Sequence, residues 1–242
     1  MDKHSPYYTD TVAILRNTPL FNGIDDERFE EMLSHTDLIT ASKKSIILSS
    51  EVCNTVFIIL SGRVKVSTIH PKTGREYIIT LLAAGDAFNM TSLLENDEVE
   101  KEEEKSIVFE AIDNLRLLYT PISTAQDWLN KHPEFNKNFF PYLAKVIRTV
   151  NTATEELALH DTMTRLVKLI LKYAEPNTNK KENTLIPIRL IHDLPHEVLA
   201  QMIGSARKVV NQNLQTLKKE GSIVYIDGHL FIKDINKLIE RD

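Results

Sequence analysis

The chain has 242 residues, of which 42% are hydrophobic and 26% charged, as is typical of a globular protein with one large or two ordinary domains. The single cysteine, Cys53, excludes an internal disulfide framework and a four-cysteine zinc or iron–sulfur site, and no apolar run approaches the ~18 residues of a membrane span. The net charge of −5 is uneven, because residues 1–160 hold 16 basic and 24 acidic side chains whereas residues 161–242 hold 13 and 10.

Apolar residues recur at helical spacing near the N-terminus, and Pro19 and Gly23 interrupt them. This pattern predicts short helices between Thr9 and Leu38 rather than one long helix. From Ile39 to about Thr120 the period changes to two, which indicates β-strands at residues 46–48, 56–60, 64–69, 77–82, 107–111 and 115–119. Strands this short, separated by turn residues, predict a small antiparallel barrel or roll.

Residues 95–105 carry seven acids and two lysines, which favours a solvated loop. Helical spacing returns from about Pro133, with Pro141 as the first-turn residue of a new helix or as a kink. Five residues at intervals of four and three then form a heptad seam: Leu143, Ile147, Val150, Thr154 and Leu157. The seam indicates a parallel homodimer, and the alternative is a lone amphipathic helix that lies on its own domain.

A hinge is expected at His160 and Asp161, with Asp161 as the cap of a helix at 162–173. A polar connector at 175–184 and a strand-like run at 186–191 follow. Two β-rich runs flank Asp227-Gly228 near the C-terminus, and this dipeptide predicts a two-residue hairpin.

Between the strand-like run and the hairpin, two short helices are joined at Gly204-Ser205. The second helix has an apolar stripe, and its opposite face carries cationic and amide groups: Arg207, Lys208, Asn211, Gln212 and Gln215. Arg and Lys pair with guanine edges or phosphates, and Asn and Gln can pair with adenine. A helix-turn-helix followed by a hairpin wing favours DNA binding over an ordinary helical hairpin.

The order of strand roll, long helix, hinge and winged helix-turn-helix resembles the Crp/Fnr family of bacterial transcription regulators. The resemblance covers about residues 20–240, and its most specific parts are FIILSGRVKVS (57–67), LLAAGDAF (81–88) and LAQMIGSARKVVNQNLQTLKKEGSI (199–223). It implies an α+β fold with an N-terminal cyclic-nucleotide-binding-like antiparallel β-roll, a long dimerisation helix and a C-terminal winged helix-turn-helix. The corresponding domains are residues 1–132, 133–160 and 161–242. It also implies a homodimer that senses a signal in the roll and binds a palindromic operator.

In this resemblance Arg207 matches an arginine that the family uses on a guanine, and Ser205 matches a position that contacts backbone phosphate. Lys208 stands where many members have a glutamate, and Gln212 replaces a second arginine. Because a lysine cannot accept a hydrogen bond from a cytosine amino group, we expect an operator that differs from the best-known half-site of the family. Pro195 replaces a frequent threonine at the start of the first helix, so the usual side-chain cap is missing.

Cyclic-nucleotide-binding members hold the ribose with a glutamate and the cyclic phosphate with an Arg-Ser pair. The matching effector-pocket residues here are Phe88, Asn89 and Met90, with Met90 at the glutamate position, followed by Lys105 and Ser106 at the Arg-Ser position. Methionine cannot accept the hydroxyl hydrogen bonds, and lysine lacks the planar fork that binds phosphate in a bidentate way. We therefore predict that the chain does not bind cAMP with regulatory affinity.

No residue pattern selects a cofactor. Haem, which some relatives use to sense nitric oxide or carbon monoxide, stays open as an alternative, and its axial ligands would come from His35, His70, His132, His160, Met32, Met90 or Met163. The ordinary alternative for each of these histidines is a surface or hinge role. Cys53 is a redox switch or an inert buried residue.

The sequence thus predicts a cytoplasmic, non-enzymatic homodimer that binds double-stranded DNA, and RNA polymerase if it is an activator. A secretory signal pattern and a membrane partner are not expected from the polar N-terminus. Neither an enzyme nor a metal site is expected, because Gly-rich phosphate loops, paired zinc-ligand motifs and nucleophile elbows are missing. The alternatives are a haem-based gas, nitrosative-stress or redox sensor of the same family, a cyclic-nucleotide-type module that lacks its enzyme, and a structural adaptor.

Overall fold

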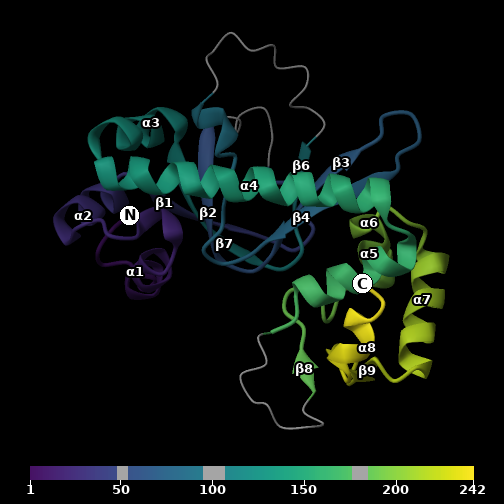
Figure 1. Cartoon of the computed structure of the whole chain (residues 1–242). Helices are drawn as coiled ribbons and strands as arrows, with labels where there is room; N and C mark the ends of the chain where they lie inside the picture. The colour runs from purple at the N-terminus through teal and green to yellow at the C-terminus, as the bar shows by residue number, and fades with distance from the viewer. Residues whose placement is uncertain (48–53, 95–106, 176–184) are drawn as a thin grey trace. The chain divides into compact units, whose positions relative to one another are not determined.

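The computed structural model describes residues 1–47, 54–94, 107–175 and 185–242, and combines helices with antiparallel sheets (Figure 1). The chain forms two compact units: unit 1 contains Met1–Ile69 and Thr80–Val150, and unit 2 contains His70–Ile79 and Asn151–Asp242. The predicted α+β fold with a β-roll, a long helix and a C-terminal helix-turn-helix is confirmed. None of the helices in the described ranges is long and apolar enough to cross a membrane. The predicted acidic loop and Cys53 lie outside the described residues, and so does all of the predicted polar connector except its first residue.

The N-terminal part of unit 1 consists of short helices, as predicted: α1 (Tyr8–Arg16), the 3-10 helix η1 (Pro19–Phe21) and α2 (Asp26–Ser34). Asp25 ends the extended segment before α2 and caps that helix, since its carboxylate accepts from the backbone N–H of Arg28 at 2.9 Å. The apolar faces of these helices pack into one cluster with the outer face of the neighbouring sheet, so the helices cover one side of the roll.

The roll is made of two antiparallel sheets. The first has the strand order β1 (Asp37–Ala41), β7 (Leu115–Pro121), β2 (Thr55–Ser61) and β5 (Ala87–Phe88), and the second has the order β4 (Glu76–Leu82), β3 (Val64–Ile69) and β6 (Ile107–Ala111). A 3-10 turn, η2 (Thr91–Leu93), follows β5. Side chains from both sheets, Phe57, Val64, Phe88, Ala111 and Leu117 among them, form a buried apolar cluster. This cluster is the interior of the roll.

Five of the six predicted strands are confirmed, and the one at 46–48 is not. In its described part, Ile46 makes only an isolated bridge to Glu110, while the N–H of Ile47 donates to the carbonyl of Phe109 at 2.8 Å. Lys44 adopts a left-handed conformation (φ +71°), which interrupts the extended run before Ile46. Two strands were not predicted, β1 and β5. The second of them has two residues and therefore no readable period.

A helix that the sequence did not predict, α3 (Ile122–Lys131), precedes the long helix α4 (Pro133–Leu159). Helix α4 continues through Pro141, so the interpretation of Pro141 as the start of a new helix was wrong (Figure 1). Proline lacks an N–H and leaves the carbonyl four residues earlier, that of Lys137, without its helical donor. Both residues are exposed, so water can bind that carbonyl and the helix tolerates the proline.

The next residue on α4 ties the helix to the roll. The Tyr142 hydroxyl donates to the carbonyl of Ala87 at 2.6 Å and accepts from the N–H of the same residue at 3.2 Å. Tyr142 is buried, and burial raises the pKa of its hydroxyl to about 12. One side chain therefore satisfies both backbone groups of a buried residue in β5.

Unit 2 contains α5 (Thr162–Lys172), β8 (Ile186–Pro187), α6 (His196–Met202), α7 (Arg207–Lys219), β9 (Ile223–Ile226), β10 (His229–Ile232) and α8 (Ile235–Ile239). Its sheet has the order β8-β10-β9. The predicted strand at 186–191 was wrong beyond Ile188, which makes an isolated bridge to Ala174. Pro187 has no N–H to donate, and Leu190 adopts a left-handed conformation (φ +61°) that ends the extended run.

Candidate nucleic-acid interface

Helices α6 and α7 are joined by a tight turn at Gly204-Ser205, as predicted. Gly204 has φ +60°, and the N–H of Ser205 donates to the carbonyl of Ala200 at 2.9 Å. A β-carbon at Gly204 would lie 2.8 Å from a methyl group of Leu157, so both conformation and space favour glycine. At the start of α6, Pro195 makes no side-chain hydrogen bond, which confirms that the usual cap is missing.

Helix α7 is anchored by its apolar stripe. Val210, Leu214 and Leu217 are buried, and they face the part of the domain formed by α5, α6 and β9. Leu199 and Ala200 of α6 are buried in the same domain. The opposite face of α7 is thereby held outward on a rigid helix.

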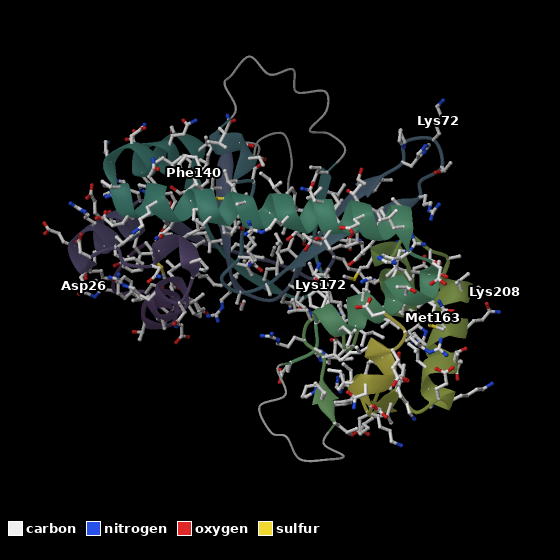
Figure 2. All side chains as sticks on the ribbon, viewed as in Figure 1. Asp26, Lys72, Phe140, Met163, Lys172 and Lys208 are labelled. Carbon is white, nitrogen blue, oxygen red and sulfur yellow. The ribbon has the colours of Figure 1, made fainter. Side chains whose placement is uncertain are left out.

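That outer face is polar and cationic. Arg207, Lys208, Gln212 and Gln215 are exposed, whereas Ser205 and Asn211 are half-buried. Figure 2 shows Lys208 projecting from the outer side of α7. At ~100° per residue these side chains of α7 fall within an arc of roughly 140°. They form one surface, which we call the reading face.

Two further cations extend the reading face, Lys218 and Lys219, both exposed. Sequence reasoning missed them, although they lie three and four residues after Gln215 and therefore on the same side of the helix. The reading face thus carries four cations along the length of α7. Cationic groups at the ends of a helix with amides between them can bind phosphates and base edges together.

The Asn211 side chain is hydrogen bonded within the domain. Its amide oxygen is hydrogen bonded to Nδ1 of His196, the first residue of α6, and Nε2 of His196 lies 3.3 Å from the hydroxyl of Tyr225 in β9. His196 and Tyr225 also line a surface cavity of about 190 Å³, together with Gln215 and Lys218. Burial raises the pKa of Tyr225 to about 12. No residue spacing predicts the contact of Asn211 with His196 and Tyr225, since these residues lie on three separate elements.

The hairpin β9–β10 is the predicted wing. Asp227 (φ +50°) and Gly228 (φ +81°) are both left-handed, as the two central residues of a type I′ turn must be. Four residue pairs, from His229–Ile226 to Ile232–Ile223, give the hairpin its register. Leu230 and Ile232 are buried and anchor it to the domain. The wing therefore follows α7 directly, as in a winged helix-turn-helix.

Asp161 caps α5, as predicted. Its carboxylate accepts from the backbone N–H of Thr164 at 2.8 Å, and this bond lowers the pKa of Asp161 below its ordinary range. The helix that it starts ends at Lys172, with Tyr173 as the C-cap.

The predicted dimer seam lies on α4, and most of it is open to solvent. Ile147, Val150 and Leu157 are 59%, 45% and 38% exposed, Thr154 is exposed, and Leu143 is half-buried against the core of unit 1. Phe140, which is 58% exposed, continues the seam three residues before Leu143 (Figure 2). Sequence reasoning missed Phe140 because it treated Pro141 as an interruption.

The three effector residues that the structure describes, Phe88, Asn89 and Met90, do not share one cluster. The ring of Phe88 is stacked between Phe57 and Phe109, with centroid distances of 4.9 and 5.0 Å, inside the roll. Met90 is buried in the other cluster, beneath the helices. Asn89 lies between them with φ +61°, and its amide donates to the carbonyl of Thr55 at 2.9 Å. Lys105 and Ser106 lie outside the described residues.

Several candidate haem ligands are held in local structure. Nδ1 of His70 accepts two backbone N–H groups of its own turn at 3.3 Å, and Nδ1 of His35 is bonded to the carbonyl of Glu31 at 2.8 Å. His132 is buried at the junction of α3 and α4, and Met32 is buried in the core beneath the helices. The bonds of His35 and His70 engage Nδ1 alone, and Nε2 of each ring is the nitrogen that would bind iron, so haem-based sensing stays a prediction.

The chain combines an antiparallel roll, a long helix with an exposed apolar seam, and a winged helix-turn-helix with a cationic outer face. This combination is typical of DNA-binding transcription regulators. Comparisons with known proteins agree. A family model of the Crp-like helix-turn-helix domain matches residues 164–241. The CRP-like cAMP-activated global transcriptional regulator of Mycobacterium tuberculosis is 23% identical over 229 residues, which cover 94% of this chain and 98% of that protein. The global nitrogen regulator of a Synechocystis species is 26% identical over 187 residues, which cover 76% of this chain and 77% of that protein.

Among solved structures, a CooA mutant from Carboxydothermus hydrogenoformans matches with a TM-score of 0.71 and 24% identity, over 93% of this chain and 96% of that one. This likeness supports the fold. Residues 164–241 thus match the Crp-like helix-turn-helix domain, and over most of its length the chain is similar to bacterial transcription regulators of the Crp/Fnr type.

Proposed function

We propose that the protein is a homodimeric, non-enzymatic regulator that binds a palindromic operator, and that a signal sensed by the roll controls this binding. The observation that carries the proposal is the reading face of α7, where exposed cations and amides lie opposite a fully buried apolar stripe. A helix held in this way presents hydrogen-bonding groups to the major groove without rearrangement. We also propose three domains, with boundaries at 132/133 and 160/161, and a cytoplasmic location. If the protein is an activator, it contacts RNA polymerase as well.

Positions along α7 suggest separate roles. Recognition helices contact base edges with their N-terminal residues, which here are Arg207 and Lys208. Gln212 and Gln215 follow at one-turn spacing and can pair with adenine or other edges. Lys218 and Lys219, at the far end of the helix, suit backbone phosphates, whose contacts position the protein and make affinity depend on salt.

The seam on α4 supports a homodimer. From Phe140 to Leu157 it spans 17 intervals, or ~26 Å at 1.5 Å per residue, and its large apolar side chains are exposed in the single chain. Pairing with the same seam of a second copy would bury them in a two-fold arrangement. Two copies then supply two reading faces, which fit two half-sites about one DNA turn apart.

A route for the signal begins at the contact between α4 and β5. Tyr142 holds Ala87 by two hydrogen bonds, and Ala87 precedes Phe88 in the aromatic stack of the roll. A ligand that altered the stack would change the position of α4 through this contact, and α4 carries the dimer seam. Such a ligand acts by binding one arrangement of the protein better than another, as in any population shift.

The effector is not cAMP in this proposal. Phe88 fills the inside of the roll, and Met90, at the position of the ribose-binding glutamate, is buried and has no group that accepts the ribose hydroxyl hydrogen bonds. The relatives do not share one signal by name either, since one is described as cAMP-activated and another as a nitrogen regulator. Titration calorimetry should therefore show no cAMP binding, and a dissociation constant in the low micromolar range would contradict this.

Operator binding is tested with fragmented genomic DNA of the source organism, from which bound fragments are recovered and sequenced. We expect wild-type protein to enrich a common sequence with inverted half-sites, and Arg207→Ala to lose the preference at one position of each half-site. Lys43→Ala is the matched control, because it removes one exposed positive charge from the roll and should leave the enriched sequence unchanged. Recovery of fragments without any common sequence would contradict the proposal.

Dimer formation is tested by sedimentation. Ile147→Glu places a charge in the seam and should shift the mass from two chains to one. Thr152→Glu places the same charge on the same helix at the outermost heptad position, where the wild-type side chain is also exposed, and should leave the dimer intact. Equal masses for the two variants would contradict the assignment of the seam.

A further inference from the structure

A chain of hydrogen bonds links one residue of the reading face to two residues behind it. His196 lies between Asn211 of α7 and Tyr225 of β9, and it bonds the first through Nδ1 and the second through Nε2. The imidazole and phenol rings have centroids 6.2 Å apart. All three side chains are half-buried, so they stand at the boundary between the domain core and the face of α7.

The chemistry of these groups selects one proton arrangement. The atom of Asn211 that faces the imidazole is the amide oxygen, which can only accept, so Nδ1 of His196 carries the hydrogen. In a neutral imidazole Nε2 then has a lone pair, and it accepts from the hydroxyl of Tyr225 at 3.3 Å. Burial raises the pKa of Tyr225 to about 12, so this hydroxyl keeps its proton at neutral pH.

This arrangement limits what Asn211 can offer to DNA. A free asparagine pairs with adenine in a bidentate way, because its oxygen accepts from N6 while its nitrogen donates to N7. Here the oxygen is turned toward α6, and the bond to His196 fixes the amide plane. The amide nitrogen remains as a donor. In the major groove guanine, adenine and thymine present acceptors, whereas the edge of cytosine presents only its amino donor.

We propose that His196 is a positioning residue, which holds Asn211 as a hydrogen-bond donor to one base edge and so sets the base preference at one position of each half-site. The inference rests on the proposed operator binding. It adds a residue outside the recognition helix to the determinants of specificity, and it predicts that the base facing Asn211 is not cytosine.

The test measures binding of the full-length protein to the operator recovered from genomic DNA and to every single base-pair change in one half-site. Four proteins are compared with wild type: His196→Ala, Asn211→Ala, the double variant, and His196→Gln, which keeps an N–H donor. We expect His196→Ala and Asn211→Ala to reduce discrimination about five-fold or more at the same base pair, with little change elsewhere. The double variant should match Asn211→Ala, and His196→Gln should retain most of the wild-type preference.

Other results would overturn the inference. Uniform weakening at all positions by His196→Ala, without recovery in His196→Gln, would make His196 a structural residue only. The inference would also be contradicted if His196→Ala lost its preference at a base pair that Asn211→Ala leaves unchanged, or lost none. Operator binding itself would stand in either case. Failure of the wild-type protein to select any sequence would refute both the proposed function and this inference.

A spectroscopic measurement tests the proton arrangement without DNA. Long-range proton–nitrogen correlation spectra of the free protein, with His196→Gln to assign the resonance, should show the Nδ1–H tautomer for His196. Tyr225→Phe removes the hydroxyl that bonds Nε2 and should shift the balance toward the other tautomer. An Nε2–H tautomer in the wild-type protein would overturn the inference whatever the DNA measurements show.

Discussion

Replacement of Tyr142 by phenylalanine removes one oxygen atom from the contact between α4 and the roll. That oxygen both donates to the carbonyl of Ala87 and accepts from its N–H, at 2.6 and 3.2 Å, and both residues are less than 10% exposed. A buried polar group that loses its partner costs ~1–3 kcal/mol, and the longer of the two bonds is the weaker. We therefore expect Tyr142→Phe to lower the free energy of unfolding of unit 1 by about 2–4 kcal/mol.

Urea unfolding followed by tryptophan fluorescence is the assay, since Trp128 is the only tryptophan of the chain and lies in the same buried cluster as Tyr142. Tyr7→Phe is the matched control, because Tyr7 is exposed and should change stability by less than ~0.5 kcal/mol. An effect of Tyr142→Phe no larger than that of the control would show that the two hydrogen bonds to Ala87 do not stabilise unit 1. The raised pKa of Tyr142 gives a second check: the hydroxyl stabilises the fold fully below its ordinary pKa of 10.0, and this contribution is lost as the pH rises through about 12. The difference between wild type and Tyr142→Phe should therefore narrow only in strong alkali.

Three further substitutions test other parts of the account. Asp161→Ala removes the cap of α5 and should lower the free energy of unfolding by ~1 kcal/mol in denaturant titrations. Because the folded-state pKa of Asp161 is lowered, this contribution is present above pH 3.8 and is lost only as the pH falls through the lower folded value. Equal stabilities of wild type and variant near neutral pH would contradict this. Gly204→Ala places a side chain at φ +60° and should cost about 1–2 kcal/mol in thermal unfolding, whereas an unchanged midpoint would argue against strain in this turn. Arg207→Ala should weaken operator binding by about 1–3 kcal/mol and relax one base position, while uniform loss at every position would make it a phosphate contact.

Most of the fold could be predicted from the sequence because local patterns and tertiary packing agree. Most strands of the roll follow the apolar period of two between turn residues. The Asp227-Gly228 turn has the left-handed geometry that its two residues predict. The errors lie where packing overrides a local pattern. Pro141 remains inside one helix, and Lys137, whose carbonyl it leaves without a helical donor, is an exposed residue. The strand-like run near Leu190 ends in a left-handed turn.

Some residues of the candidate site could be predicted from the sequence, and others could not. Helical periodicity was enough to place Arg207 and Gln215 on one exposed face, since both belong to a single element. The bond between His196 and Asn211 could not be predicted, because it depends on the packing of α6 and β9 against α7. The effector residues were predicted from a resemblance alone, and the structure places Phe88 and Met90 in different apolar clusters.

We propose that two copies of this chain bind one operator, each with the reading face of α7 in one half-site. The most direct measurement is the mass of the complex between the full-length protein and the operator recovered from genomic DNA, with a duplex in which one half-site is scrambled as the comparison. We predict two chains on the intact duplex, two inverted half-sites about one DNA turn apart, and strongly reduced affinity for the scrambled duplex. One chain per duplex, or equal affinity for both duplexes, would contradict the account.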